Sequence, residues 1–320
     1  MRAELDIFRA LADPTRMRIV ALLRAMELSV GELAQVLGQS QPRVSRHVKI
    51  LVDADIAERR KEGSWVFVGL GLEAVVAPLL RAIDAWGAGG DDHWTRADIA
   101  RLAAVRADRA AAAEAYFDAH AGEWDAIRSL HVAESEVETA MVGALGDDAL
   151  GRLIDIGTGT GRILELFAGD ADSALGIDRN PEMLRLARAK LAAAGLVEQA
   201  EVRQGDMYAL PLPGGSADTI ILHQVLHYAQ QPASAIAEAA RLLRESGRLL
   251  IVDFAAHDRE ELRSRDAHAR LGFDDAQIER WFAQAGIDGG LHQRLEGGEL
   301  TVKLWLGRRR PEPKLKAVAA

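Results

Sequence analysis

Apolar and polar positions divide the chain into a helical first part and a later part in which strands and helices alternate. Before residue 153, apolar residues recur at three- and four-residue spacing, which is typical of amphipathic helices. After it, strands are expected at residues 153–156, 174–178, 200–203, 217–223 and 247–254, in alternation with helices. This alternation predicts an α/β sheet, and two further strands are expected at 291–296 and 299–307, joined through Gly297 and Gly298. The 320 residues are enough for about two domains.

Helix boundary signals are clear in the first 60 residues. Asp13 precedes Pro14 and is placed to cap a helix, and Ser29 and Glu32 have the spacing of a capping box. The helix opened by Ser29 is expected to end at Gly38, and the next helix begins a few residues later. A short helix, a glycine-containing turn and a second helix form the helix-turn-helix pattern.

The helix that starts at Gln41 or Pro42 carries two different stripes. Val44, Val48 and Leu51 lie on one face, whereas Arg43, Arg46 and Lys49 recur on the opposite face. Taken alone, three such cations more often mark a solvated face. The segment 56–68 alternates around a turn with Gly63, however, and carries Arg59, Arg60 and Lys61 toward its tip. A helix-turn-helix followed by a basic hairpin predicts a mainly α-helical winged helix.

The net charge of −9 is unevenly distributed. Residues 1–70 contain eleven Lys and Arg against nine Asp and Glu, so this segment is +2 and the remainder is −11. Nucleic acid would therefore be bound by the first part of the chain. The sequence has no Cys, which excludes disulfides, thiolate metal sites and cysteine catalysis.

Three stretches of the first part, 11–20, 31–34 and 39–47, closely resemble the ArsR-type winged-helix repressors. The resemblance covers about residues 1–86 and implies a homodimer, paired with the help of a helix at 73–86. Two recognition helices would then reach successive major grooves of an inverted repeat in double-stranded DNA. The positions that match base or phosphate contacts are Ser40, Gln41, Arg43, Ser45, Arg46, His47 and Lys49, with Arg59, Arg60 and Lys61 on the wing.

One departure from that family limits what the chain can sense. The arsenic sensors carry cysteines where this chain reads Met26-Glu-Leu-Ser-Val30, so thiolate metal sensing cannot operate, and no metal site is expected. His47 can be imagined as a metal ligand. A His on a recognition helix is more often a DNA contact or a packing residue.

The second part is organised around a strand that ends at Asp155 and is followed by Gly157, Gly159 and Gly161. Glycines at alternate positions let the backbone turn tightly and approach a ligand closely. A dinucleotide fingerprint counted from Gly157 needs glycine or alanine where Arg162 stands, and no Gly-Lys-Ser/Thr phosphate loop follows. The loop is therefore predicted to bind a cofactor without a pyrophosphate.

This loop resembles the first motif of the class I S-adenosylmethionine-dependent methyltransferases, which implies a seven-stranded Rossmann-like sheet that binds S-adenosylmethionine or S-adenosylhomocysteine. The second strand ends at Asp178, about 20 residues beyond the glycines, where an acid binds the ribose hydroxyls. Asp206 and Met207 match the positions that meet the adenine amino group and ring. The implied cofactor residues are Asp155, Gly157, Thr158, Gly159, Gly161, Asp178, Arg179, Asp206, Met207 and His223.

The segment between the two parts contains a Gly/Asp hinge at 86–93 and an Ala/Arg-rich helix at 97–115. The expected domains are residues 1–88 for the winged helix, 89–115 for a linker and spacer helix, and 116–307 for the methyltransferase-like domain. A tail at 308–320 is expected to be disordered. Residues 116–127 resemble a helix that closes over the methionine end of the cofactor. Tyr116 and Trp124 either line that site or pack onto the sheet.

The sequence leaves the chemistry of the second domain open. His223, His227 and Tyr228 are weak candidates for a base that deprotonates a methyl acceptor. Arsenite methylation would need cysteines that are absent. One interpretation is a transcriptional regulator, a repressor, that senses S-adenosylmethionine or S-adenosylhomocysteine. The alternative is an active small-molecule methyltransferase with an autoregulatory DNA-binding domain. The chain shows no signal-peptide pattern and no long apolar run, so a cytoplasmic protein is expected.

Overall fold

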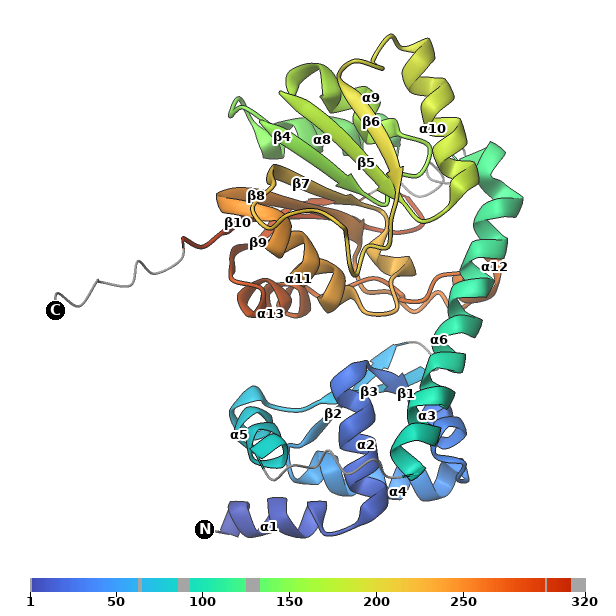
Figure 1. Ribbon diagram of the computed structural model, residues 1–320, viewed down its shortest axis with the longest axis vertical. Coiled ribbons are helices and arrows are strands. Elements are labelled where there is room, and N and C mark those ends of the chain that lie inside the picture. Colours follow the sequence, from blue (N-terminus) through green and yellow to red (C-terminus); the bar gives the residue numbers. More distant parts are fainter. Residues whose placement is uncertain (1, 63–64, 86–92, 125–132, 297, 312–320) are drawn as a thin grey trace, which may run out of the picture. The chain divides into compact units, whose positions relative to one another are not determined.

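The computed structural model describes residues 2–62, 65–85, 93–124, 133–296 and 298–311 (Figure 1). The chain forms two compact units, Met1–Ala112 and Ala113–Ala320. The predicted hinge at 86–93 falls almost wholly outside the described residues. No helix within the described ranges is long and apolar enough to cross a membrane.

The first unit is a winged helix-turn-helix, as predicted. Its helices are α1 (Arg2–Leu11), α2 (Pro14–Ala25), α3 (Val30–Leu37), α4 (Gln41–Asp53) and α5 (Glu73–Ala85). Its strands are β1 (Leu28–Ser29), β2 (Ala57–Glu62) and β3 (Trp65–Leu70). The three strands form an antiparallel sheet in the order β1-β3-β2, so β2 and β3 make the wing.

The predicted caps explain where these helices begin and end. The Asp13 side chain accepts a hydrogen bond from the Arg16 N–H, and Ser29 and Glu32 form both halves of the capping box. Gly38 ends α3 at φ +65, a left-handed conformation that glycine adopts at little cost. Val44, Val48 and Leu51 of α4 are fully buried, as their spacing predicts.

Helix α6 (His93–His120) supplies part of the first unit's core. Leu102 and Val105 lie in the same apolar cluster as Ile19, Leu33 and Val44. The interpretation of 89–115 as a linker and spacer did not include these contacts, because three large aliphatic residues, Ile99, Leu102 and Val105, among many Ala and Arg form only a short stripe. The predicted domain boundaries themselves stay a prediction.

The second unit is built on a seven-stranded sheet, as expected. The strands are β4 (Arg152–Ile156), β5 (Ser173–Asp178), β6 (Ala200–Gln204), β7 (Ala217–His223), β8 (Leu243–Phe254), β9 (Ile287–Leu295) and β10 (Val302–Arg309). Their order is β6-β5-β4-β7-β8-β10-β9. The strands from β6 to β8 are parallel, and β10 is antiparallel to both of its neighbours, β8 and β9. The strand order reverses at β4, and open α/β sheets bind ligands at the carboxyl end of such a switch point.

Helices cover both faces of this sheet (Figure 1). One apolar cluster contains residues of α8 (Glu134–Leu145), α9 (Arg162–Phe167) and α10 (Pro181–Ala193). The other contains residues of α11 (Pro232–Leu242) and α13 (Asp275–Gln284). A short helix, α12 (Glu261–Arg265), follows β8, and single 3-10 turns occur at η1 (Ala121–Glu123), η2 (Ala168–Asp170) and η3 (Leu226–Tyr228).

The prediction of a disordered tail from Arg308 is wrong at its start. Arg308 pairs with Arg248 of β8 and Asp288 of β9, and Arg309 pairs with Ile287. The Arg310 N–H donates to the Gly286 carbonyl at 2.8 Å. A run of three arginines offers no apolar pattern, but backbone pairing on both sides holds this stretch. Residues 312–320 of the predicted tail lie outside the described residues.

Candidate functional sites

The glycine loop after β4 is tied closely to β5. The N–H groups of Gly157 and Thr158 both donate to the Ile177 carbonyl, at 2.7 and 2.9 Å. Gly157 has φ +80, and a Cβ there would overlap the Val225 side chain. Only glycine fits this position, so the loop keeps its backbone at the sheet edge, where a ligand can approach.

Asp178 is a structural part of this loop as well as a candidate ligand. Its Oδ2 accepts the Gly159 N–H at 2.8 Å, and its Oδ1 accepts the Asn180 N–H at 2.8 Å. Burial raises the pKa of Asp178, against the lowering effect of the N–H groups of Asn180, Gly159 and Arg179. Each carboxylate oxygen can accept a second hydrogen bond, so the group can also receive ribose hydroxyls.

The other predicted cofactor residues lie at successive strand ends. Asp155 is fully buried in β4, and strand register places Asp178 of β5 opposite Gln204 of β6, two residues before Asp206. Asp206 is exposed and accepts the Tyr208 N–H at 3.1 Å, whereas Met207 packs on the core. Thr158 and His223 are buried, Gly161 is the N-cap of α9, and Arg179 is exposed. Parallel pairing places β6, β5, β4 and β7 side by side, so these strand ends share one edge of the sheet.

The C-terminal end of α6 covers that edge. The Asn180 side chain donates to Asp118 at 2.7 Å, and a Cβ on Gly159 would lie 3.3 Å from the Trp124 indole nitrogen. The Phe117 ring meets the rings of Trp124 and Tyr228 edge-on, at centroid distances of 5.3 and 4.9 Å. Trp124 therefore lies against the glycine loop. The part of the predicted cover beyond Trp124 falls outside the described residues.

Two of the three candidate bases, His227 and Tyr228, lie in buried surroundings of different kinds. His227 is 2% exposed, and its Nδ1 is 2.8 Å from Oδ1 of Asp253, which is fully buried. Burial, followed by the neighbouring Tyr116, Asp266 and Asp253, raises the pKa of Tyr228 well above its usual value. His268 lies 4.4 Å from the His227 ring, between centroids.

Sequence reasoning missed Asp253, His268, Asp118 and Asn180. Asp253 stands near the end of the fifth strand, the same positional signal that singled out Asp178.

The predicted DNA-binding residues fall into two groups. Arg43, Arg46, Lys49 and Lys61 are exposed, and no carboxylate in the described part of the chain pairs with them. Ser40 and Gln41 are exposed at the start of α4, and Ser45 is half-buried. Arg59 donates to the Ser45 carbonyl at 3.0 Å, which fastens the wing to α4. His47 is half-buried, with Nδ1 3.7 Å from Asp13 Oδ1.

Arg60 differs from the other wing cations. It donates to Glu27 at 2.9 Å and pairs with Glu62, which is 6% exposed. Burial works against the charge, but the Glu27 and Glu62 carboxylates outweigh it and raise the pKa of Arg60. The guanidinium also lies over the Phe67 ring, 5.3 Å from its centroid. Arg60 thus braces the wing, and its charge is matched by two carboxylates.

Comparison with known proteins separates the same two regions. Residues 11–60 match a helix-turn-helix domain model, and residues 154–251 match a methyltransferase domain model. The chain is 40% identical over 101 residues to the arsenic resistance transcriptional regulator ArsR1 of Pseudomonas putida, covering 30% of this chain and 75% of that protein.

Relatives of the second region are methyltransferases. The chain is 34% identical over 112 residues to a phosphatidylethanolamine N-methyltransferase of Cereibacter sphaeroides, covering 35% of this chain and 55% of that protein. It is 28% identical over 168 residues to the uncharacterized methyltransferase YcgJ of Bacillus subtilis, covering 49% of this chain and 64% of the relative. The chain thus spans less than two thirds of either relative's length. The solved structure of YcgJ covers 55% of this chain and 99% of its own, at 20% identity and a TM-score of 0.50, which shows a shared fold.

Fold, motifs and relatives together define a helix-turn-helix DNA-binding domain joined to an S-adenosylmethionine-dependent methyltransferase domain. The chain belongs to the ArsR-type transcriptional regulators.

Proposed function

We propose that this protein is a DNA-binding repressor whose second domain senses S-adenosylmethionine or S-adenosylhomocysteine. The observation that carries the proposal is helix α6, which belongs to both units. At one end it is anchored on the helix-turn-helix, and at the other it covers the glycine loop. The proposed repressor acts as a homodimer on an inverted repeat, with α4 in the major groove.

The anchor on the helix-turn-helix is a bidentate ion pair. Arg18 of α2 donates through Nε and Nη2 to the two oxygens of Asp98, both at 2.6 Å, and Asp98 is 4% exposed. Arg101 donates to the Val36 carbonyl at 3.1 Å. Val36 lies in the last turn of α3, directly before the turn that leads to α4. A shift of α6 would therefore act on the segment that positions the recognition helix.

The other end of α6 lies where the nucleoside would be bound. Phe117 contacts Tyr228, Asp118 accepts from Asn180, and Trp124 lies at Gly159. The residues fit the cofactor, because Gly157 lets the backbone turn at the sheet edge without a side chain and each Asp178 oxygen can accept a further hydrogen bond. A ligand shifts a conformational equilibrium only by its differential affinity for the two states. Contacts between the bound nucleoside and this cover would differ between the two states, and they supply the required difference in affinity.

The test is a decoupling substitution. Asp98→Asn removes the charge that holds Arg18, so operator affinity should lose most of its dependence on bound nucleoside while both ligands still bind. Asp84→Asn is the matched control, because Arg24 of α2 pairs with Asp84 at 2.7 Å in an exposed position outside α6. Fluorescence anisotropy with operator DNA and calorimetry with each nucleoside measure the two affinities. Unchanged coupling in Asp98→Asn would refute the role of α6.

A second function, methyl transfer to a small molecule, is favoured by the His227–Asp253 pair. The Asp253 oxygens accept the N–H groups of His227 and Phe254, at 3.2 and 2.8 Å, as a carboxylate does. The proton shared by the His227 imidazole and this carboxylate then belongs on Nδ1 of His227. Nε2 of the same ring keeps a lone pair that can accept a proton. The bound cofactor would supply an electrophilic methyl group. His227 would accept the proton of a hydroxyl or amine acceptor.

This second function predicts a specific kinetic result. His227→Asn should lower turnover by about 10²- to 10⁴-fold with nucleoside affinity unchanged, measured as S-adenosylhomocysteine release across a panel of phenols and amines. If wild-type protein releases none with any acceptor tested, only the sensor function is left.

A further inference from the structure

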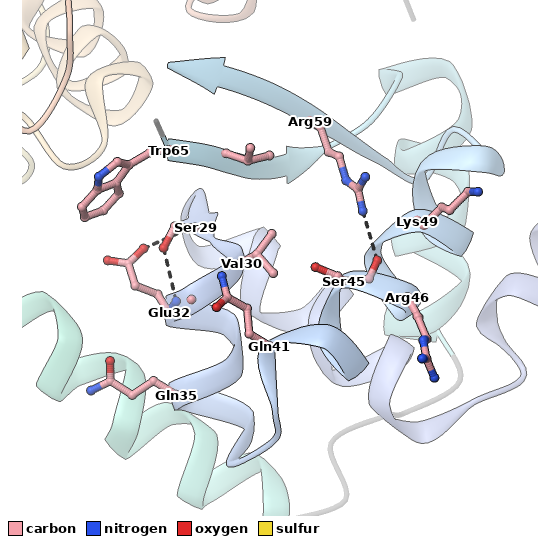
Figure 2. A pocket seen from close by; sticks show the side chains of 12 residues that line it. Ser29, Val30, Glu32, Gln35, Gln41, Ser45, Arg46, Lys49, Arg59 and Trp65 are labelled. Carbon is pink, nitrogen blue, oxygen red and sulfur yellow. Dashed lines mark hydrogen bonds between the residues drawn. The ribbon is translucent and has the colours of Figure 1, made fainter. Parts of the chain in front are cut away.

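A groove of about 810 Å³ lies in the first unit between the start of α3, the recognition helix α4 and the wing (Figure 2). The two sides of this groove are lined by different kinds of side chain. Arg46, Lys49 and Arg59 gather on one side, whereas Trp65 and Glu32 lie on the other. The predicted DNA contacts named only the cationic side.

The cationic side is available to an anion. Arg46 and Lys49 make no ion pair with any described residue. Arg59 uses one N–H on the Ser45 carbonyl, and its charge is not cancelled by a carboxylate within the described ranges. This hydrogen bond joins wing to recognition helix, so it also sets the width of the groove (Figure 2).

Trp65 presents a large apolar surface on the same groove. Its side chain is 41% exposed, although tryptophan is usually well buried. The indole stacks on Phe67, with centroids 5.8 Å apart, and Phe67 is 2% exposed. A buried ring thus holds an exposed one in place, which limits the ordering entropy lost when a partner covers it.

We propose that this groove seats one sugar-phosphate strand of the operator, and the proposal rests on the DNA-binding function above. Lys49 and Arg59 meet phosphates, Arg46 reaches a phosphate or a base edge beside them, and Trp65 packs on a deoxyribose. Charge complementarity favours this occupant, because the cations continue along the exposed face of α4. Trp65 thereby becomes a DNA contact that the basic pattern did not indicate.

Glu32 weakens the same contact. Its carboxylate accepts the Ser29 N–H at 2.8 Å as half of the capping box, so the side chain is needed for α3. Glutamine serves equally well at this capping position. Glu32→Gln therefore removes a negative charge from the groove without removing the cap, and operator affinity should rise about twofold at low salt.

The experiment measures operator affinity of the full chain by fluorescence anisotropy, using a sequence selected from random DNA. Trp65→Ala should weaken binding at least about fivefold. Ile50→Ala is the matched control, because Ile50 is also 41% exposed, lies on α4 and does not line the groove. It should leave the affinity within about twofold of wild type. The gain in Glu32→Gln should shrink as salt rises.

The outcomes separate this proposal from the one it rests on. If wild-type protein binds no operator, the DNA-binding function fails. If wild type binds and Trp65→Ala binds equally well, the groove proposal is overturned while DNA binding stands. If Trp65→Ala instead abolishes binding of adenosine monophosphate, used as a small aromatic anion, at unchanged operator affinity, the groove is a small-molecule site and the proposal is likewise overturned.

Discussion

Arg46 and Lys49 of the first unit are exposed cations without a carboxylate partner among the described residues, whereas several candidate site residues of the second unit are held by neighbouring groups. Asp155 is fully buried, Asp178 already accepts two backbone N–H groups, and His227 is fixed by Asp253. The candidate DNA-binding site thus consists of exposed side chains on the surface of the first unit. The candidate cofactor site of the second unit is preformed, because hydrogen bonds to the backbone and between side chains fix its residues.

This difference between the two candidate sites follows from the ligands proposed for them. A DNA strand is a long polyanion, and exposed cations can meet it without prior desolvation. A nucleoside is small, so its affinity depends on a cavity whose shape exists beforehand. Changes of charge should therefore dominate in the first unit, and changes of shape in the second.

The largest effect is expected from Gly159→Val. Gly159 has φ +52, and a Cβ there already lies 3.3 Å from Trp124. The added methyl groups would occupy space needed by the ligand, so nucleoside affinity should fall about 100-fold or more, or ~2.7 kcal/mol. Gly195→Val is the control, because Gly195 has φ +72 and nothing lies within 4 Å of its Cβ position. Equal calorimetric affinities in the two variants would show that the ligand binds elsewhere.

Arg60→Ala should affect stability rather than DNA binding. It removes the guanidinium that pairs with the buried Glu62 and the half-buried Glu27, which should cost about 2 to 4 kcal/mol of unfolding free energy. Arg59→Ala, which removes one hydrogen bond to a carbonyl, should cost about 1 kcal/mol. Denaturant titration of both variants measures this. A stable Arg60→Ala protein with impaired operator binding would place Arg60 among the DNA contacts after all.

Arg46→Ala should weaken operator binding by about 1 to 3 kcal/mol if the side chain reads a base edge. The matched control is Arg203→Ala in the second unit, whose guanidinium is exposed but paired with Glu201 at 2.6 Å. Titrations at several salt concentrations distinguish the two kinds of contact. If Arg46→Ala lowers only the salt dependence of binding, Arg46 contacts a phosphate instead. If Arg46→Ala and Arg203→Ala weaken binding equally, the difference between unpaired and paired surface arginines does not matter for operator binding.

The three tyrosines all belong to the second unit and should titrate late. Burial raises the pKa of Tyr116 to about 12 and also raises the pKa of Tyr208 and Tyr228. At pH 10, native protein should therefore show little phenolate absorbance, whereas protein in guanidinium should be about half ionised. The pKa of Tyr116 is higher in the folded protein than in the unfolded protein, so the protonated phenol contributes to the free energy of unfolding. This contribution is present below about pH 10 and is lost as pH rises through about 12. Half-ionisation of native protein at pH 10 would mean that the cover is open.

Local signals account for what the sequence predicted well. Asp13, Ser29 and Gly38 act on helix ends within a few residues, and the apolar runs of the sheet are each continuous in sequence. The strand ends that carry Asp155 and Asp178 were found for the same reason. Their roles in binding stay predictions.

Contacts between distant segments account for what the sequence did not reveal. Arg60 looks like any wing cation until Glu27, 33 residues away, is placed beside it. The pairing of Asn180 with Asp118 spans 62 residues, and that of Arg18 with Asp98 spans 80. Such pairs leave no periodic trace, because each residue type alone is compatible with an exposed surface.

The most direct test of the account is the operator affinity of the full chain without ligand and at saturation with S-adenosylmethionine or S-adenosylhomocysteine. The two nucleosides differ by a methyl group and a positive charge, so sensing predicts different operator affinities for the two complexes. By linkage, saturating operator should change each nucleoside's affinity by the same factor. Identical operator affinities in all three states would contradict the sensor function.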